Sequence, residues 1–149
     1  MPGLAVVRPG RRGTFPVKEA GRAITVTAGI IEREGKILVA RRRPGKHMGG
    51  KWEFPGGKLE PGETPEESLV RELDEELAVR AEVGGFLCSA SWEGDGLSLE
   101  LLVYRVLTLS GEPVLREHQE IRWVEPRALA ALDLADSDRK VVETLFRTP

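Results

Sequence analysis

Short apolar stretches separated by turn-forming residues run through most of the chain, and their composition is typical of β-strands. Residues 23–31 and 36–40 are rich in β-branched residues and flank Glu34-Gly35, which predicts two strands joined by a tight turn. A second pair of strands is predicted around the turn-forming residues 93–96. The strands predicted in this way are residues 23–31, 36–40, 83–92, 97–107 and 120–124.

Other segments carry their apolar residues three or four positions apart, which predicts helices. The clearest spans residues 65–77, where the hydroxyl of Thr64 can cap the first turn and Pro65 suits the first helical position. Glu67 completes a Thr-x-x-Glu capping box with Thr64. The shorter predicted helices are residues 127–132 and 137–146. These elements together predict an α/β fold in which helices flank a mixed sheet.

The helix predicted at residues 65–77 has an apolar face and an acidic face. At about 100° per residue, Val70 falls in one arc with the three leucines Leu69, Leu73 and Leu77, and this arc is expected to face the core. The adjoining arc holds Glu72, Glu75 and Glu76 at spacings of three and four, so that their carboxylates stand side by side. The repulsion between such neighbours is offset when a divalent cation lies among them, and carboxylate oxygens suit Mg²⁺ or Mn²⁺. The alternative is a solvated acidic face on which Arg71 pairs with Glu67 or Glu75.

A glycine-rich loop at residues 54–63 precedes this helix. Its three glycines allow the backbone to approach a ligand closely, because they carry no Cβ. The loop also places one more acid, Glu63, directly before the helix cap. The loop and the acidic helix together are therefore expected to form one site.

Composition excludes several classes of protein. The 149 residues suffice for one domain with a core that needs no disulfide, and 22 basic residues nearly balance 24 acidic ones. The formal charge of -2 gives no reason to expect a stable complex with nucleic acid or a membrane, and no apolar run approaches the roughly 18 residues of a membrane helix. The single cysteine, Cys88, and the absence of a secretory signal favour the reducing cytoplasm.

Residues 1–22 differ in composition from residues 23–149, which form the predicted domain. They contain three prolines, four glycines and an excess of basic residues, a composition that forms little regular structure. We expect a tail or an arm packed on the domain, and the alternative is a basic tail that meets nucleic acid.

The spacing from Gly57 to Glu63, and from there to the run at residues 71–79, resembles the Nudix box. That box consists of Gly, Glu, Arg-Glu, a bulky aliphatic residue, Glu-Glu, Gly and a final aliphatic residue. Ala78 stands where the family usually has the glycine that ends the helix, and alanine there would cost roughly 1 kcal/mol if a positive φ is needed. The resemblance implies the Nudix fold, an α/β/α sandwich with a mixed β-sheet.

The likeness extends over about residues 23–147. Residues 41–42 and 47–58 resemble the MutT branch, which removes oxidised guanine nucleotides from the nucleotide pool and so protects DNA. Residues 117–119, Trp123 and residues 134–138 are similar to MutT and to the bacterial CTP pyrophosphohydrolase branch.

The resemblance implies roles for three groups of residues. The expected metal ligands are the carbonyl of Gly57 and the carboxylates of Glu72, Glu75, Glu76 and Glu117. The expected catalytic residues are Glu63, Arg71, Glu75, Glu76 and Glu117, with Glu63 supporting the site and Arg71 orienting a carboxylate. The expected substrate-binding residues are Arg42, Phe54 and Asp138 at the nucleobase and Lys58 near the phosphates.

The function that the resemblance implies is Mg²⁺-dependent hydrolysis, with Mn²⁺ as the alternative ion, of a nucleoside triphosphate to nucleoside monophosphate and pyrophosphate. The general base is a glutamate of the box or Glu117, and the sequence leaves this choice open. The substrate is expected to be 8-oxo-dGTP or a pyrimidine nucleotide such as CTP. Asp138 stands where MutT has asparagine, and an ionised carboxylate cannot donate a hydrogen bond. The alternatives are another nucleoside diphosphate-linked substrate and a non-catalytic nucleotide-binding module.

Two residues near the predicted site carry weaker expectations. His118, beside Glu117, is expected to be exposed and structural, and the alternative is a base. Trp92 is a candidate for the mouth of the pocket because it flanks a hairpin turn. The sequence does not indicate an oligomeric state.

Overall fold

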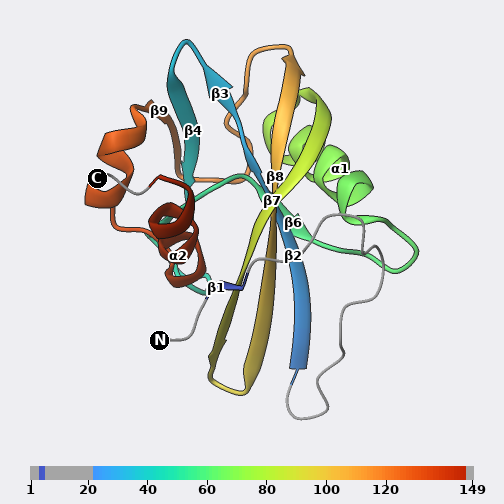
Figure 1. The fold of residues 1–149 in the computed structure, drawn as a ribbon, viewed down its shortest axis with the longest axis vertical. Coiled ribbons are helices and arrows are strands. Elements are labelled where there is room, and N and C mark those ends of the chain that lie inside the picture. Colours follow the sequence, from blue (N-terminus) through green and yellow to red (C-terminus); the bar gives the residue numbers. More distant parts are fainter. Residues whose placement is uncertain (1–3, 6–21, 147–149) are drawn as a thin grey trace.

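Two β-sheets form the framework of the computed structural model, which describes residues 4–5 and 22–146 (Figure 1). The larger sheet has five strands in the order β1-β7-β8-β2-β6, and the smaller has four, with β3, β4 and β5 in order and β9 paired to β4. The strands are β1 (Leu4–Ala5), β2 (Arg22–Ile30), β3 (Glu32–Arg33), β4 (Lys36–Arg41), β5 (Trp52–Glu53), β6 (Gly56–Lys58), β7 (Arg80–Gly94), β8 (Leu97–Ser110) and β9 (Glu120–Val124).

The larger sheet is mixed. The strands β7 and β8 form a long antiparallel hairpin, as the sequence predicts, whereas β2 runs parallel to β8. The strand predicted at residues 23–31 was expected to pair with residues 36–40 across the turn at Glu34-Gly35, and this pairing is wrong. Only β3 pairs with β4 at that turn, because the chain leaves the larger sheet after Ile30 and β2 pairs with β8 and β6 instead.

Helices cover both faces of the larger sheet (Figure 1). The helix α1 (Pro65–Leu77) contacts β2, β6 and β7, and α2 (Asp136–Leu145) contacts β7 and the 3-10 helix η1 (Pro126–Ala131). Alternating residues of β8 face opposite cores: Leu101 and Val103 pack in the α2 core, and Leu102 packs in the α1 core. This arrangement confirms the predicted sandwich of two helical layers around a mixed sheet.

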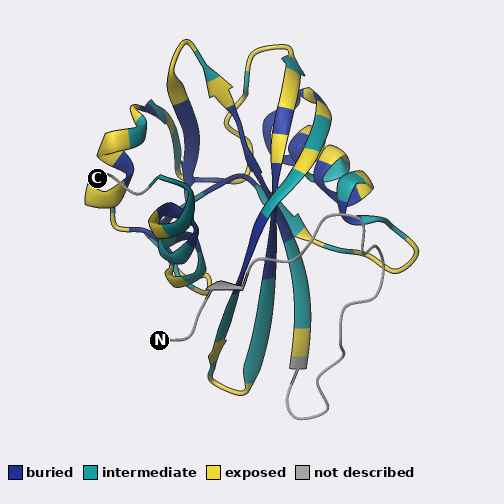
Figure 2. Ribbon diagram, viewed as in Figure 1, coloured by how far each residue is buried: buried dark blue, intermediate teal, exposed yellow. Residues whose placement is uncertain are grey.

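The start of α1 follows from its sequence. Thr64 accepts a hydrogen bond from the backbone N–H of Glu67, and the Glu67 carboxylate accepts one from the N–H of Thr64, which completes the predicted capping box. Figure 2 shows α1 buried on the side facing the sheet and exposed on the other. Val70 was expected on the buried side, but it is 36% exposed, and Ser68 and Glu76 are buried there with the leucines instead.

The end of α1 lies at Ala78, the position at which this chain departs from the usual Nudix box. Ala78 adopts φ 58° and ψ 38°, the left-handed conformation that glycine tolerates best. The expectation of a positive φ at this position is therefore confirmed.

Of the predicted tail, Leu4–Ala5 and Arg22 are described: Leu4–Ala5 forms a short strand along β7, and Arg22 is the first residue of β2. The rest of that prediction lies outside the described residues. Within the part of the chain that the structure describes, none of the helices combines the length and apolar character needed to cross a bilayer.

Candidate active site

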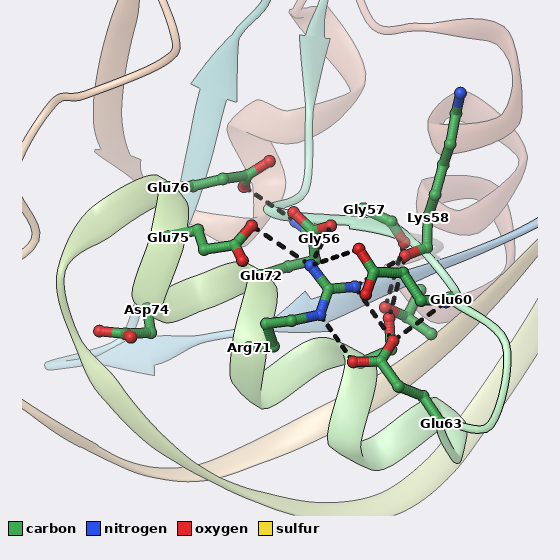
Figure 3. Close-up of polar contacts among 12 residues, drawn as sticks. Gly56, Gly57, Lys58, Glu60, Glu63, Arg71, Glu72, Asp74, Glu75 and Glu76 are labelled. Atoms are coloured by element: carbon green, nitrogen blue, oxygen red, sulfur yellow. Dashed lines mark hydrogen bonds and ion pairs between the residues drawn. The ribbon is translucent and has the colours of Figure 1, made fainter.

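Arg71 lies at the centre of a cluster of carboxylates between α1 and the loop before it (Figure 3). Its Nε and Nη2 donate to the two oxygens of Glu63, at 2.6 and 3.0 Å, and Nη2 also donates to the carbonyl of Lys58 at 3.0 Å. Its Nη1 donates to Glu72 at 3.0 Å and to Glu75 at 3.2 Å. One guanidinium therefore ties the loop to two carboxylates of the helix.

These contacts change the ionisation of the cluster. The hydrogen bond from Arg71 lowers the pKa of Glu63 to about 2, so Glu63 is ionised at any physiological pH. The pKa of Arg71 is raised, chiefly by its hydrogen bond to Glu63. Glu63 and Arg71 are thus a permanently charged pair, consistent with a supporting role for both.

The strand β6 places backbone directly against the acidic face of α1. It pairs with β2 in the register Thr27 to Gly57, which holds the glycine-rich loop at the edge of the larger sheet. A Cβ at Gly57 would collide with the carboxyl group of Glu72, so a larger residue here would force that carboxyl group to move. The N–H of Gly56 donates to Glu76 at 3.3 Å. Backbone and carboxylate oxygens therefore converge where the sequence predicts a single site.

Glu76 is a buried carboxylate among other acids. It is 7% exposed, and no ion pair to it is found within residues 22–146. Burial raises its pKa to about 9, and the negative charges of Glu53, Glu72 and Glu117 add to this rise. Partial burial likewise raises the pKa of Glu72 in spite of its contact with Arg71. Both carboxyl groups therefore hold a proton more readily than exposed glutamates do.

The donor set fits a hard divalent cation. All the candidate donors are oxygens, the Glu76 carboxylate needs a positive partner, and the bare Gly57 leaves its backbone accessible beside Glu72. No group of three His, Cys, Asp or Glu side chains among the described residues is close enough together to form a complete metal centre. Glu72 and Glu75 both pair with Arg71.

Glu117 lies in the exposed connection between β8 and β9 rather than on α1. It is close enough for its charge to raise the pKa values of Glu72 and Glu76. The structure therefore brings this distant residue to the same cluster.

A pocket of about 280 Å³ lies beside the cluster, and all four predicted substrate-binding residues line it, namely Arg42, Phe54, Lys58 and Asp138. Gly56 and Gly57 line it as well, so the pocket adjoins the carboxylate cluster. Lys58 is exposed, and its side chain points away from the carboxylates (Figure 3). An apolar wall from β2 and β8 completes it, with Ile24, Val26, Leu97, Leu99 and Leu101.

Asp138 is the buried acid of this pocket. It is 5% exposed and accepts a hydrogen bond from the N–H of Phe54 at 2.9 Å. Burial raises its pKa, and the negative charge of Glu53 raises it further. Arg42 is held at the same end by a bond of 2.7 Å from its Nε to the carbonyl of His47 and by an ion pair of 3.1 Å with Glu53.

Glu53 is the residue of this region that the sequence analysis missed. One of its carboxylate oxygens accepts a hydrogen bond from Arg42, and the other lies 2.8 Å from Nε2 of His118. His118 was expected to be exposed, but it is buried, with only 5% of its surface exposed. The sequence signal that could have identified Glu53 is its position between two aromatic residues, Trp52 and Phe54, both of which are buried in the structure.

Trp92 lines the pocket, as its place beside the hairpin turn predicts. Its indole N–H donates to Asp136 at 3.0 Å, and its ring meets that of His47 edge-on at 5.2 Å. It therefore connects β7, the first turn of α2 and the loop after β4.

Comparisons with known proteins agree with this geometry. The family model described as "NUDIX domain" matches residues 21–145. The chain is 40% identical over 125 residues to the CTP pyrophosphohydrolase of Escherichia coli K12, covering 84% of this chain and 93% of that protein. It is 34% identical over 127 residues to the 8-oxo-dGTP diphosphatase of the same organism, covering 85% and 98%. The solution structure of the E. coli ORF135 protein superimposes with a TM-score of 0.75 at 40% identity, covering 83% of this chain and 88% of that one.

Proposed function

The chain belongs to the Nudix family, and from this premise we propose that it is a divalent-metal-dependent pyrophosphohydrolase of nucleoside triphosphates. One observation carries the proposal: the pocket with Arg42, Phe54 and Asp138 shares the strand β6 with the carboxylate cluster. A nucleobase in the pocket would therefore direct its phosphates towards the acids of α1.

The proposed metal ligands are the carbonyl of Gly57 and the carboxylates of Glu72, Glu75, Glu76 and Glu117. The proposed ion is Mg²⁺, which prefers oxygen ligands and shares the phosphates of a substrate, and Mn²⁺ is the alternative. When bound, such an ion neutralises phosphate charge and lowers the pKa of a coordinated water. Arg71 donates hydrogen bonds to two of these proposed ligands, Glu72 and Glu75, and so supports them on α1.

The protein's own groups complete the proposed reaction. Water attacks an inner phosphorus of the triphosphate, the anhydride bond breaks, and the proton of the water passes to Glu117 or to a glutamate of α1. The products are nucleoside monophosphate and pyrophosphate. Lys58, which is exposed and lines the pocket, is proposed to contact phosphate oxygens. Glu63 and Arg71 hold the loop and the helix together throughout.

The proposed substrates are CTP-type and 8-oxo-dGTP-type nucleotides, the classes named in the E. coli relatives. Asp138, Arg42 and the backbone of Phe54 are the groups proposed to contact the base. We further propose that the enzyme acts in the cytoplasm, where these nucleotides occur and where the buried Cys88 remains a free thiol.

The test is a panel of CTP, modified CTP, normal and oxidised dNTPs, ADP-ribose and a dinucleoside polyphosphate, compared by kcat/KM with Mg²⁺. Turnover is expected to be highest for a CTP-type or 8-oxo-dGTP-type nucleotide. Glu76→Gln should abolish it, whereas Asp74→Asn should not, because Asp74 lies on the same helix but points away from the cluster (Figure 3). Preference for ADP-ribose or a dinucleoside polyphosphate would contradict the proposed substrate class, and binding without any turnover would indicate a non-catalytic module.

A further inference from the structure

The connection between β8 and β9, residues 111–119, carries Glu117 without any regular structure of its own. Glu117 itself is exposed. A proposed ligand or base on such a segment needs support from neighbouring elements, because a displacement of about 1 Å in a catalytic group can cost on the order of a hundredfold in rate.

Arg43, in the loop that follows β4, supplies such support. Its Nε donates to the carbonyl of Glu117 at 2.8 Å, and its Nη2 donates to the carbonyl of Arg116 at 3.2 Å. The guanidinium is planar and its donors are fixed relative to each other, so one side chain orients two consecutive peptide groups. The orientation of the Glu117 backbone therefore depends directly on Arg43.

Arg116 joins the same segment to the helix that bears the other carboxylates. Its Nη1 donates to the carbonyls of Asp74 and Glu75, at 3.2 and 3.3 Å. These are last-turn carbonyls of α1, which has no basic residue in its own last turn. The N–H of Val114 also donates to the carbonyl of Leu77 at 2.8 Å. The connection is thus docked on α1 itself.

The far end of the segment is fixed by His118 and Gln119. The buried ring of His118 contacts Glu53 at 2.8 Å, and the N–H of Gln119 donates to the carbonyl of Arg41 at 2.8 Å. Hydrogen bonds to Arg43, β4, β5 and α1 therefore hold the segment on both sides of Glu117. They involve residues 114, 116, 117, 118 and 119.

We propose that Arg43 and Arg116 are positioning residues that set the distance between Glu117 and the carboxylates of α1. Arg43 orients the backbone of Glu117 from one side, and Arg116 ties the same backbone to the last turn of α1 from the other. This inference rests on the proposed function, since it assigns Glu117 a place in the same reaction. Neither arginine touches the pocket, so their effect on the reaction passes through Glu117.

The first experiment needs neither substrate nor metal. Amide hydrogen exchange at residues 116–119 is measured in the nucleotide-free, metal-free protein for wild type, Arg43→Ala and Arg127→Ala. Arg127 is a matched control because its side chain is 81% exposed and, within the described part of the chain, pairs only with Glu125. Exchange in this segment should become about tenfold faster in Arg43→Ala alone. Unchanged exchange would overturn the inference whether or not the protein hydrolyses nucleotides.

The second experiment is a double-mutant cycle in the active enzyme. Arg43→Ala should lower kcat about tenfold and raise the Mg²⁺ concentration for half-maximal activity, with the KM for nucleotide and the melting temperature unchanged. Arg43→Lys, which can still reach one carbonyl, should recover part of the loss. In a Glu117→Gln background, Arg43→Ala should have less than about a twofold further effect, because both changes remove the same contribution. Fully additive losses would show that Arg43 acts independently of Glu117 and would overturn the inference.

If the wild type hydrolyses none of the nucleotides, the proposed function fails. The exchange experiment then still tests whether Arg43 orients the backbone at Glu117. If the wild type is active and Arg43→Ala is as active as Arg127→Ala, the positioning inference fails and the proposed function stands. The same two comparisons apply to Arg116→Ala, whose exchange effect should extend to the last turn of α1 because Arg116 binds carbonyls there.

Discussion

The carboxylate of Asp138 on α2 accepts a hydrogen bond of 2.9 Å from the backbone N–H of Phe54 at the pocket. Burial and the nearby charge of Glu53 raise the pKa of Asp138, so this carboxyl binds a proton more readily than an exposed aspartate does. In its protonated form it can both donate and accept a hydrogen bond, as asparagine can, whereas its ionised form only accepts.

The preference of the wild type for one nucleobase over another should therefore depend on pH, and that of Asp138→Asn should not. At low pH the two proteins should give similar ratios of kcat/KM for 8-oxo-dGTP against CTP. As pH rises through the raised pKa of Asp138, the wild-type ratio alone should change. Parallel profiles for the two proteins between pH 6 and 9 would show that Asp138 does not contact the base.

Glu76→Gln should stabilise the metal-free protein while it removes activity. Between the ordinary pKa of 4.5 and the raised value of about 9, the folded protein binds more protons at Glu76 than the unfolded chain does. The free energy of unfolding therefore falls as pH rises through this range, and the amide variant escapes that loss. At pH 8 the variant should be more stable by about 1 kcal/mol or more, and near pH 4 the difference should vanish.

Denaturant unfolding in EDTA at several pH values measures this effect, with Asp74→Asn as the control. Adding Mg²⁺ should stabilise the wild type and leave Glu76→Gln nearly unchanged, because the variant lacks one proposed ligand. A variant that is less stable than the wild type at pH 8 would contradict the view that Glu76 is an uncompensated buried charge.

Ala78→Gly should raise stability by about 1 kcal/mol, because alanine at φ 58° carries a steric cost that glycine lacks. The measurement is the shift of the denaturant midpoint at constant slope. Ala130→Gly, at an exposed position of η1, is the control and should destabilise by about 0.5–1 kcal/mol. An equal loss of stability in Ala78→Gly and Ala130→Gly would show that the backbone at Ala78 is not strained.

Arg71→Lys should lower kcat about tenfold to a hundredfold although it keeps the positive charge. A lysine cannot bind both oxygens of Glu63 and reach Glu72 and the Lys58 carbonyl at the same time. The loss should appear in kcat and in the Mg²⁺ requirement, since the carboxylates of α1 lose their orientation. Steady-state kinetics across Mg²⁺ concentrations test this, and wild-type values would show that charge alone suffices.

Local signals in the sequence were sufficient for much of this structure. The bounds of α1 follow from Thr64, Pro65 and Glu67, whose interactions span only a few residues. The left-handed end at Ala78 follows from one position in the Nudix box. The side-by-side glutamates of α1 follow from helical spacing, and the sheet hairpin at residues 94–97 follows from its turn residues.

The pairing of strands that lie far apart in the sequence could not be predicted from such local signals. The strand β2 pairs in parallel with β8, which lies far away in sequence, and no local signal distinguishes that partner from the nearer β4. Val70 is apolar at a helical position yet exposed, since the buried arc of α1 is shared with Ser68 and Glu76. The burial of His118 depends on Glu53, a residue of another sheet strand, so its environment appears only when both are placed in space.

The most direct test of the central claim is identification of the products that purified protein forms from CTP and from 8-oxo-dGTP with Mg²⁺. We predict one nucleoside monophosphate and one pyrophosphate per substrate consumed, with no product in EDTA and none from Glu76→Gln, while Asp74→Asn retains wild-type yield. Release of nucleoside diphosphate and phosphate, or equal turnover by Glu76→Gln, would contradict the account.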